Sequence, residues 1–283
     1  TGGTGFIGSY LIRSLAANHE LTCLVRDPSK LPQDSQVTAV QGDLGVAEGL
    51  SGLPQQVDAV LHFAQANVPF PDAANELFEV NAGSTERLAD YARRAGATRF
   101  IYASSGSVYA QNAGPLSEES PLGPQGLYAL TKQMSEGILE CYKPYFNVGV
   151  LRLFAPYGPH QTGRMFPGII GRVRSGQQVA LTNEGQPRVN PIFIDDVVRI
   201  VDQALALSSH YLANVGGPAV VSVADIATLA GNVLGSEPQF EHRTDPAVWN
   251  LIADTTKLHA TFSLPDLVSP AEGIRRMVEA SNT

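Results

Sequence analysis

The chain opens with the stretch TGGTGFIG (Thr1–Gly8), and this stretch decides the expected fold. Gly2, Gly5 and Gly8 recur at a spacing of three, and an amphipathic segment near Phe6–Ala17 follows directly. Glycine permits a tight turn and lets the backbone approach a phosphate, while a helix N-terminus offers free N–H groups and a partial positive charge. The stretch therefore predicts a turn that binds a pyrophosphate, between a strand and a helix.

Short apolar segments alternate with amphipathic ones through the first half of the chain. The predicted strands are nearly continuous apolar runs, which is typical of a parallel sheet covered by helices on both faces. They lie at Leu21–Val25, Val37–Gln41, Val57–Phe63, Thr98–Ser104 and Asn147–Phe154, and further helices are predicted near Asn75–Ala95 and Leu127–Tyr142. This alternation predicts a doubly wound parallel sheet of the α/β class.

The alternation ends after about Phe154, where Pro and Gly become more frequent. Helices are predicted near Arg164–Ser175, Asp196–Leu207, Val223–Leu234 and Ala271–Ala280. We expect a dinucleotide-binding domain of residues 1–154, to which residues 190–216 return. Residues 155–189 and 217–283 are expected to form a smaller α/β lobe that binds the substrate.

The composition excludes several classes of protein. A net charge of −8 over 283 residues argues against broad nucleic-acid binding, and no apolar run is long enough to span a membrane. No secretory signal segment opens the chain, and the six histidines have no metal-ligand spacing. Cys23 and Cys141 lie in apolar periodic stretches and are expected to be buried free thiols. A reducing cytoplasm fits these features best.

Several further motifs follow the glycine turn in a fixed order: GDL (Gly42–Leu44), HFAQA (His62–Ala66), VNAGSTERL (Val80–Leu88), YASSGSVYA (Tyr102–Ala110), YALTK (Tyr128–Lys132), LRLFAPYGP (Leu151–Pro159), RVNPIFIDDVV (Arg188–Val198) and NVGGP (Asn214–Pro218). Together with the turn they resemble the extended short-chain dehydrogenase/reductase superfamily, and specifically its NAD-dependent epimerase/dehydratase family. The resemblance covers nearly the whole chain and implies a Rossmann-like nicotinamide-binding fold.

Tyr128 and Lys132 are four residues apart on a predicted helix, so they share one face. A nearby ammonium group stabilises a phenolate and lowers the tyrosine pKa, which lets the tyrosine exchange a proton. The resemblance implies that Tyr128 is the general acid/base, that Lys132 also holds the nicotinamide ribose, that Ser105 binds the same substrate oxygen, and that Asn81 has a positioning role.

The resemblance also implies the residues that bind the cofactor: Gly2, Gly5, Phe6, Ile7, Gly8, Arg26, Lys30, Asp43, Leu44, Phe63, Ala64, Gln65, Tyr128, Lys132 and Pro156. Arg26 stands at a strand end where an acidic residue would bind the ribose hydroxyls of NAD. A guanidinium there favours a 2′-phosphate, so we expect a preference for NADP over NAD. Asp27 would instead serve NAD if the alignment shifted by one residue.

The resemblance implies that the substrate is a nucleotide-linked sugar, contacted by Ser105, Ser107, Arg188 and Arg243, with the two arginines on its diphosphate. Two positions depart from the family pattern. Ala155 replaces an Asn that contacts the substrate, and Gly106 and Ser107 replace the acidic pair of the 4,6-dehydratases. We therefore expect an epimerase or a dehydrogenase and not a dehydratase. The alternatives are an NADPH-dependent reductase of a non-nucleotide ketone or aldehyde, and a non-catalytic cofactor sensor.

Two further expectations concern assembly and the start of the sheet. The resemblance implies a homodimer in which the helical segments Asn75–Ala95 and Leu127–Tyr142 pair with their two-fold mates. A glycine turn of this kind also needs a strand before it, so we expect a short apolar strand ahead of Thr1.

Overall fold

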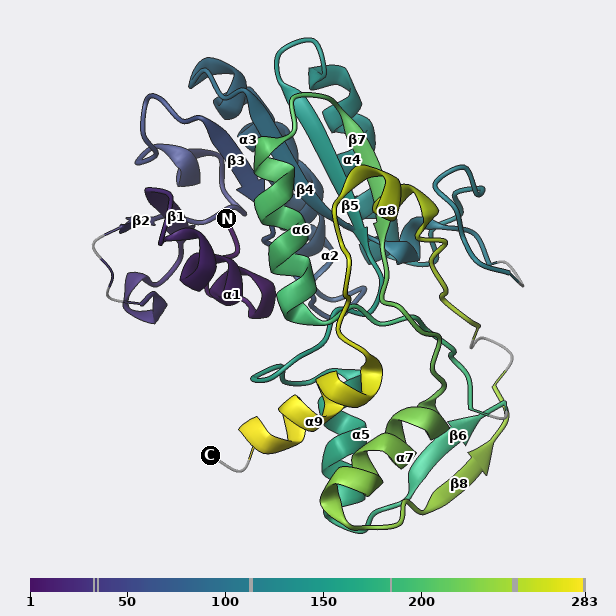
Figure 1. Cartoon of the computed structure of the whole chain (residues 1–283). Coiled ribbons are helices and arrows are strands. Elements are labelled where there is room, and N and C mark those ends of the chain that lie inside the picture. The colour runs from purple at the N-terminus through teal and green to yellow at the C-terminus, as the bar shows by residue number, and fades with distance from the viewer. Residues whose placement is uncertain (33, 35, 112–113, 184, 246–248, 282–283) are drawn as a thin grey trace. The chain divides into compact units, whose positions relative to one another are not determined.

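The computed structural model describes residues 1–32, 34, 36–111, 114–183, 185–245 and 249–281. The chain forms two compact units (Figure 1). The first consists of residues 1–110, 121–152 and 198–213, and the second of residues 111–120, 153–197 and 214–283. These boundaries differ from the predicted ones chiefly at residues 111–120 and 190–197, which lie in the second unit.

The first unit begins with helix α1 (Phe6–Leu15) and a two-stranded sheet. Strands β1 (Leu21–Val25) and β2 (Val37–Gln41) pair in parallel, in a register that sets Leu21 against Val37. Ile12 of α1 packs with Cys23, Val25 and Leu31 in a small apolar cluster on this sheet. The turn between β1 and β2 contains the short helix η1 (Pro28–Lys30).

A four-stranded sheet forms the centre of the first unit, in the order β3–β4–β5–β7. Its strands are β3 (Ala59–His62), β4 (Arg99–Ser105), β5 (Asn147–Leu153) and β7 (Tyr211–Val215), and β3 pairs with β4 in parallel. Helix α6 (Ile194–Ala206) lies in front of this sheet in Figure 1, and α3 (Ser84–Arg94) and α4 (Leu127–Tyr142) lie behind it. Helices on both faces explain why the strands are apolar throughout, and the α/β class is confirmed.

The segment predicted as one helix over Asn75–Ala95 is interrupted. It consists of α2 (Ala74–Phe78), the π-helical turn η3 (Glu79–Gly83) and α3. A π-turn widens the helix locally and is frequent at functional sites. Here it contains Asn81, whose side chain is 1% exposed.

The second unit contains three longer helices and a parallel pair of short strands. Helix α7 (Val223–Leu234) packs against both α5 (Met165–Arg174) and α9 (Pro270–Ala280). Strand β6 (Val179–Thr182) pairs with β8 (Phe240–Arg243). Helix α8 (Thr256–Thr261) and the strands β6, β7 and β8 were not predicted from the sequence, because after about Phe154 short apolar segments no longer alternate regularly with amphipathic ones.

The two cysteines differ in their surroundings. Cys23 is buried, as predicted, whereas Cys141 is exposed near the end of α4, so the prediction that both thiols are buried was wrong for Cys141. An apolar period on a helix does not by itself say which face is covered. Within the described residues, no helix has the length and apolar character that a membrane span requires.

Candidate active site

The opening glycine turn leads into α1 as the sequence predicts. The amide of Gly5 donates to the carbonyl of Gly2 at 2.9 Å, and Gly5 is the N-cap residue of α1. No described side chain caps this helix, and its first turn contains no acidic residue. The first N–H groups of α1 are therefore available to an anionic ligand. Phe6 and Ile7 occupy that first turn and are half-buried.

The three glycines of the turn meet different constraints. Gly2 has a φ of +80°, and a Cβ there would lie 2.6 Å from the backbone of Phe63 and Ala64. A Cβ on Gly8 would lie 2.0 Å from the Gly2 carbonyl oxygen, so the helix could not pack so closely against the turn. Gly5 is exposed, and its Cβ would stand 3.2 Å from the same oxygen. Gly2 and Gly8 are thus required by the turn itself, while Gly5 leaves the backbone open to a ligand.

The end of β1 presents charged side chains of both signs. Arg26 is exposed there. The Asp27 carboxylate accepts hydrogen bonds from the amide and the hydroxyl of Ser29, at 3.1 and 2.7 Å, and lies 3.9 Å from the Lys30 ammonium. These hydrogen bonds to Ser29 lower the pKa of Asp27. Asp27 is therefore engaged in capping η1, whereas Arg26 is exposed.

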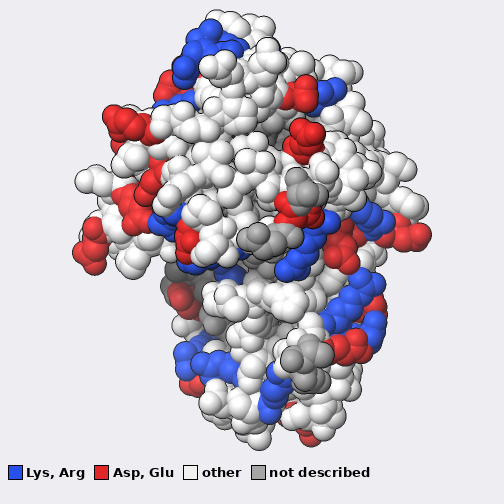
Figure 2. All heavy atoms as spheres, turned by 90° about the vertical axis from the view of Figure 1, so that its left-hand side faces the viewer, with Lys and Arg blue, Asp and Glu red and all other residues white. Residues whose placement is uncertain are grey.

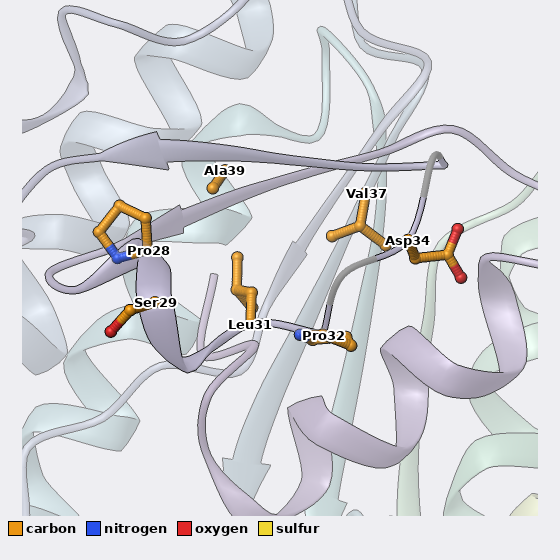
Figure 3. A pocket seen from close by; sticks show the side chains of 7 residues that line it. All are labelled: Pro28, Ser29, Leu31, Pro32, Asp34, Val37 and Ala39. Carbon is orange, nitrogen blue, oxygen red and sulfur yellow. The ribbon is translucent and has the colours of Figure 1, made fainter.

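A hollow of about 340 Å³ lies beside this turn, between η1 and β2 (Figure 3). Leu31, Val37 and Ala39 contribute apolar side chains to it. None of the predicted site residues lines this hollow. It is a gap at the edge of the two-stranded sheet and not the place where the predicted chemistry gathers.

The segments after β2 and β3 contain the next predicted cofactor residues. Asp43 is exposed and accepts a hydrogen bond from the Gly45 amide at 2.8 Å, and Leu44 is buried beside it. The Phe63 amide donates to the Thr1 carbonyl at 3.3 Å, which places Phe63 and Ala64 against the glycine turn. The turn and the segment after β3 therefore form one continuous surface.

Tyr128 and Lys132 lie on α4 as predicted, and β4 runs beside them. Lys132 is 1% exposed, and its ammonium donates to the Ala103 carbonyl at 2.8 Å. The same nitrogen stands 4.9 Å from the ring centre of Tyr102 and 6.0 Å from that of Tyr128. Burial lowers the pKa of Lys132 to about 7, against a smaller opposing effect of Glu136.

The hydroxyl of Tyr128 is accessible, unlike the lysine beneath it. It donates to the Gln65 side-chain oxygen at 3.0 Å, and the tyrosine is half-buried. Gln65 itself is exposed. The predicted acid/base and the segment after β3 are therefore in direct contact.

Ser105 ends β4 and carries a hydroxyl at the start of the next turn. Its oxygen accepts hydrogen bonds from the hydroxyl and the amide of Ser107, at 2.9 and 3.2 Å, within the turn η4 (Gly106–Val108). Both serines are half-buried. The structure thus brings Ser105 and Ser107 into contact with each other, in the unit that contains Tyr128 and Lys132.

Asn81 belongs to a buried polar network behind the sheet. Its side-chain oxygen accepts from the Ala66 amide at 2.7 Å, and its nitrogen donates to the Ala66 carbonyl at 3.2 Å. His62 is fully buried among Thr1, Ser84 and Thr85, and burial holds its pKa well below the ordinary value. Asn81 therefore fixes Ala66 in the segment after β3, while His62 is a packed core residue.

Sequence reasoning missed a buried ion pair beside these groups. Arg152 on β5 and Glu136 on α4 form two hydrogen bonds, of 3.0 and 2.6 Å, with side chains 4% and 11% exposed. Arg152 also donates to the Tyr109 hydroxyl at 2.7 Å. The signal was present, because a single arginine in the apolar run Asn147–Phe154 requires a buried partner.

The remaining predicted residues, Pro156, Arg188 and Arg243, belong to the second unit. Arg188 is exposed, and its amide donates to the Asn250 side chain at 2.8 Å. The Arg243 guanidinium forms an exposed pair with Glu241 at 2.7 Å. Figure 2 shows acidic and basic side chains interspersed on the face that it draws. No described His, Cys, Asp or Glu side chains form a group of three suited to a metal ion.

Comparison with known proteins identifies the family and the fold. Residues 1–216 match the sequence profile of the NAD dependent epimerase/dehydratase family. A UDP-glucose 4-epimerase of Mycolicibacterium smegmatis is 27% identical, over 99% of this chain and 96% of its own length. A protein of Bacillus subtilis described as an uncharacterized UDP-glucose epimerase is 26% identical, over 97% of this chain and 94% of its own. The structure of a UDP-glucuronic acid 4-epimerase from Bacillus cereus, in complex with UDP-glucuronic acid and NAD, superposes with a TM-score of 0.88 at 21% identity, covering 99% of this chain and 97% of that one.

Proposed function

We propose, since the chain belongs to the NAD dependent epimerase/dehydratase family, that it interconverts a secondary alcohol and a ketone on a nucleotide-linked sugar with a nicotinamide cofactor. The observation that carries the proposal is the pairing of Tyr128 with Lys132. A fully buried ammonium lies 6.0 Å from the ring centre of an accessible tyrosine, and a serine ends the neighbouring strand. Such a pairing is suited to proton transfer at a carbinol oxygen.

The first unit fits a dinucleotide. The exposed Gly5 and the uncapped N-terminus of α1 would hold the pyrophosphate, and Asp43, Leu44, Phe63, Ala64 and Gln65 would line the rest of the cofactor. The nicotinamide, when bound, accepts and returns a hydride. Tyr128 moves the proton of the substrate hydroxyl, Ser105 orients that oxygen, and Lys132 favours the phenolate and binds the ribose. Asn81 keeps the segment after β3 in place.

We propose NADP as the preferred cofactor over NAD. The support is the exposed Arg26 at the end of β1, with Lys30 nearby, while the carboxylate of Asp27 is occupied by Ser29. A guanidinium at this position would bind a 2′-phosphate through charge-assisted hydrogen bonds. NAD is the cofactor of the Bacillus cereus complex, so the preference is tested directly below.

Residues 155–189 and 217–283, which belong to the second unit, would form the substrate-binding lobe. Arg188 and Arg243 are proposed to bind the diphosphate of the sugar nucleotide, and Ser105 and Ser107 to contact the sugar. The support for a nucleotide sugar is that the compared relatives are described as UDP-sugar epimerases. Ala155, with its φ of +43°, replaces the family Asn, and a side chain that cannot hydrogen-bond changes how the sugar is held there.

We also propose a homodimer in which the segments Asn75–Ala95, with α2, η3 and α3, and Leu127–Tyr142, with α4, pair with their two-fold mates. Leu130 and Met134 are 41% and 37% exposed one turn apart on α4, and Phe78 on the adjoining α2 is 41% exposed. Apolar side chains gathered on neighbouring helices favour contact with a second apolar surface. A second copy of the chain would supply it.

The test is to denature the purified protein and identify any dinucleotide that it releases, and then to measure turnover of UDP-glucose and UDP-glucuronic acid. Tyr128→Phe should retain cofactor binding and lose about 100- to 10,000-fold in turnover, since the substitution removes the phenolic hydroxyl that would transfer the proton. Normal turnover by this variant would reject the proposal. Turnover of a ketone with NADPH, without turnover of either nucleotide sugar, would replace the epimerase with a reductase.

A further inference from the structure

Strand β4 and helix α4 are joined at two successive strand positions. The Ala103 carbonyl accepts from Lys132 at 2.8 Å, and the Ser104 hydroxyl donates to Glu136 at 2.5 Å. Ser105, the proposed partner of the substrate oxygen, comes next. Since Tyr128, Lys132 and Glu136 follow one another at intervals of four, they share one face of the helix.

Glu136 is the point at which this junction is locked to the rest of the sheet. Its two carboxylate oxygens accept both hydrogen bonds from Arg152 on β5, and one of them also accepts from Ser104 on β4. Arg152 is held in turn by the Tyr109 hydroxyl and lies 4.7 Å above the tyrosine ring. A carboxylate with three such donors in a nearly closed site cannot change position freely.

We propose that Glu136 is a positioning residue for the reaction: it ties α4 to the ends of β4 and β5 and holds a negative charge one helical turn from the buried Lys132. The inference rests on the proposed function of Tyr128 and Lys132. In this role Glu136 would act through Ser104, Arg152 and Lys132.

The charges around Lys132 support this role. Tyr102 on β4 and Tyr128 on α4 face it. Burial lowers the pKa of His62 on β3, and the positive charges of the Thr1 ammonium and of Lys132 lower it further. Among these groups Glu136 is the one whose charge raises the pKa of Lys132, against the larger effect of burial. Loss of its negative charge should therefore let Lys132 lose its proton at lower pH.

The experiment measures the pKa of Lys132 by NMR in protein labelled with carbon-13 at the lysine ε-carbon. The Lys132 resonance is assigned by its absence in Lys132→Met. Glu136→Gln preserves the size of the side chain and removes the charge, and should lower the pKa by about one unit, the low end of the effect of a neighbouring opposite charge. Glu136→Asp preserves the charge and should leave this pKa within about 0.3 units of wild type.

A matched control lies one turn further along the same helix. Glu140 is 61% exposed and pairs with Lys143, so Glu140→Gln should leave the pKa of Lys132 unchanged. Because Glu136→Gln leaves Arg152 buried without its partner, Glu136→Gln/Arg152→Gln is measured as well and should also show the lowered pKa. If it folds and the pKa equals that of wild type, or if Glu140→Gln lowers the pKa equally, the proposal is overturned. The loss of turnover in Tyr128→Phe tests the proposed function separately.

Discussion

Replacement of Lys132 by Met should make the nucleotide-free protein more resistant to unfolding at neutral pH, although it removes a residue of the proposed mechanism. Lys132 is 1% exposed, and burial lowers its pKa to about 7. Methionine has a similar length and no charge, so the substitution removes the ammonium and retains most of the packing.

The sign follows from proton binding. An unfolded chain binds a proton on lysine up to pH ~10.4, whereas the folded chain releases it above about pH 7, so the free energy of unfolding of the wild type rises with pH across this interval. A difference of about 3.5 pKa units corresponds to roughly 5 kcal/mol of destabilisation, which is complete below pH 7 and absent above about 10.5. About 3 kcal/mol of it should disappear between about pH 7 and pH 9.5.

In Lys132→Met, position 132 contributes no pH dependence to the free energy of unfolding, because methionine does not titrate. It leaves the Ala103 carbonyl without its ammonium donor, at a cost of about 1–3 kcal/mol that does not vary with pH. The informative quantity is therefore the change with pH. The advantage of the variant over wild type should be about 3 kcal/mol larger at about pH 7 than at about pH 9.5.

Urea unfolding of dinucleotide-free protein at the two pH values measures this difference. Lys143→Met is the control on the same helix, because Lys143 reaches solvent beside Glu140 and its replacement should not reproduce the change. A stability difference between Lys132→Met and wild type that is the same at both pH values would refute the reasoning, since burial of a charged group would then not govern this site.

Three further outcomes are expected. Gly8→Ala should destabilise the protein by about 1–3 kcal/mol in urea unfolding and weaken dinucleotide binding, because the new Cβ would lie 2.0 Å from the Gly2 carbonyl oxygen. The control is Gly171→Ala on α5, where a Cβ meets nothing within 4 Å; this substitution should be neutral or stabilising. Arg26→Ala should weaken NADPH about 10- to 100-fold by calorimetry and NADH much less, and equal weakening would contradict the NADP preference. Leu130→Glu should give a folded monomer in light scattering, and a wild type that is already monomeric would remove the dimer from the proposal.

Much of the fold could be predicted because its signals are local. The predicted helices Leu127–Tyr142 and Val223–Leu234 agree with α4 and α7 residue for residue, since local signals mark their ends: Gly126 precedes α4, and Ser222 and Gly235 flank α7. The π-helical interruption at Glu79–Gly83 could not be predicted, because its residues have no propensity that distinguishes a widened turn from an ordinary helical one. The pairing of β6 with β8 joins residues about 60 positions apart, and a four-residue strand has too few alternations to be recognised.

The candidate site divides in the same way. Tyr128, Lys132 and Ser105 could be found because they belong to short motifs: Tyr128 and Lys132 are four residues apart on one helix, and Ser105 lies at the end of a predicted strand. The degree of burial of Lys132 could not be predicted, since it depends on Tyr102 and Ala103 of strand β4, which is distant in the sequence. Glu136 lies four residues beyond Lys132, and Arg152 is a charge in an apolar strand, so each is visible alone. Their pairing needs the tertiary structure, which alone brings α4 against β5. Local motifs can thus identify the residues proposed to react. Residues that influence the charge of those groups can be recognised in the sequence as polar side chains at positions where the local pattern predicts a buried apolar one.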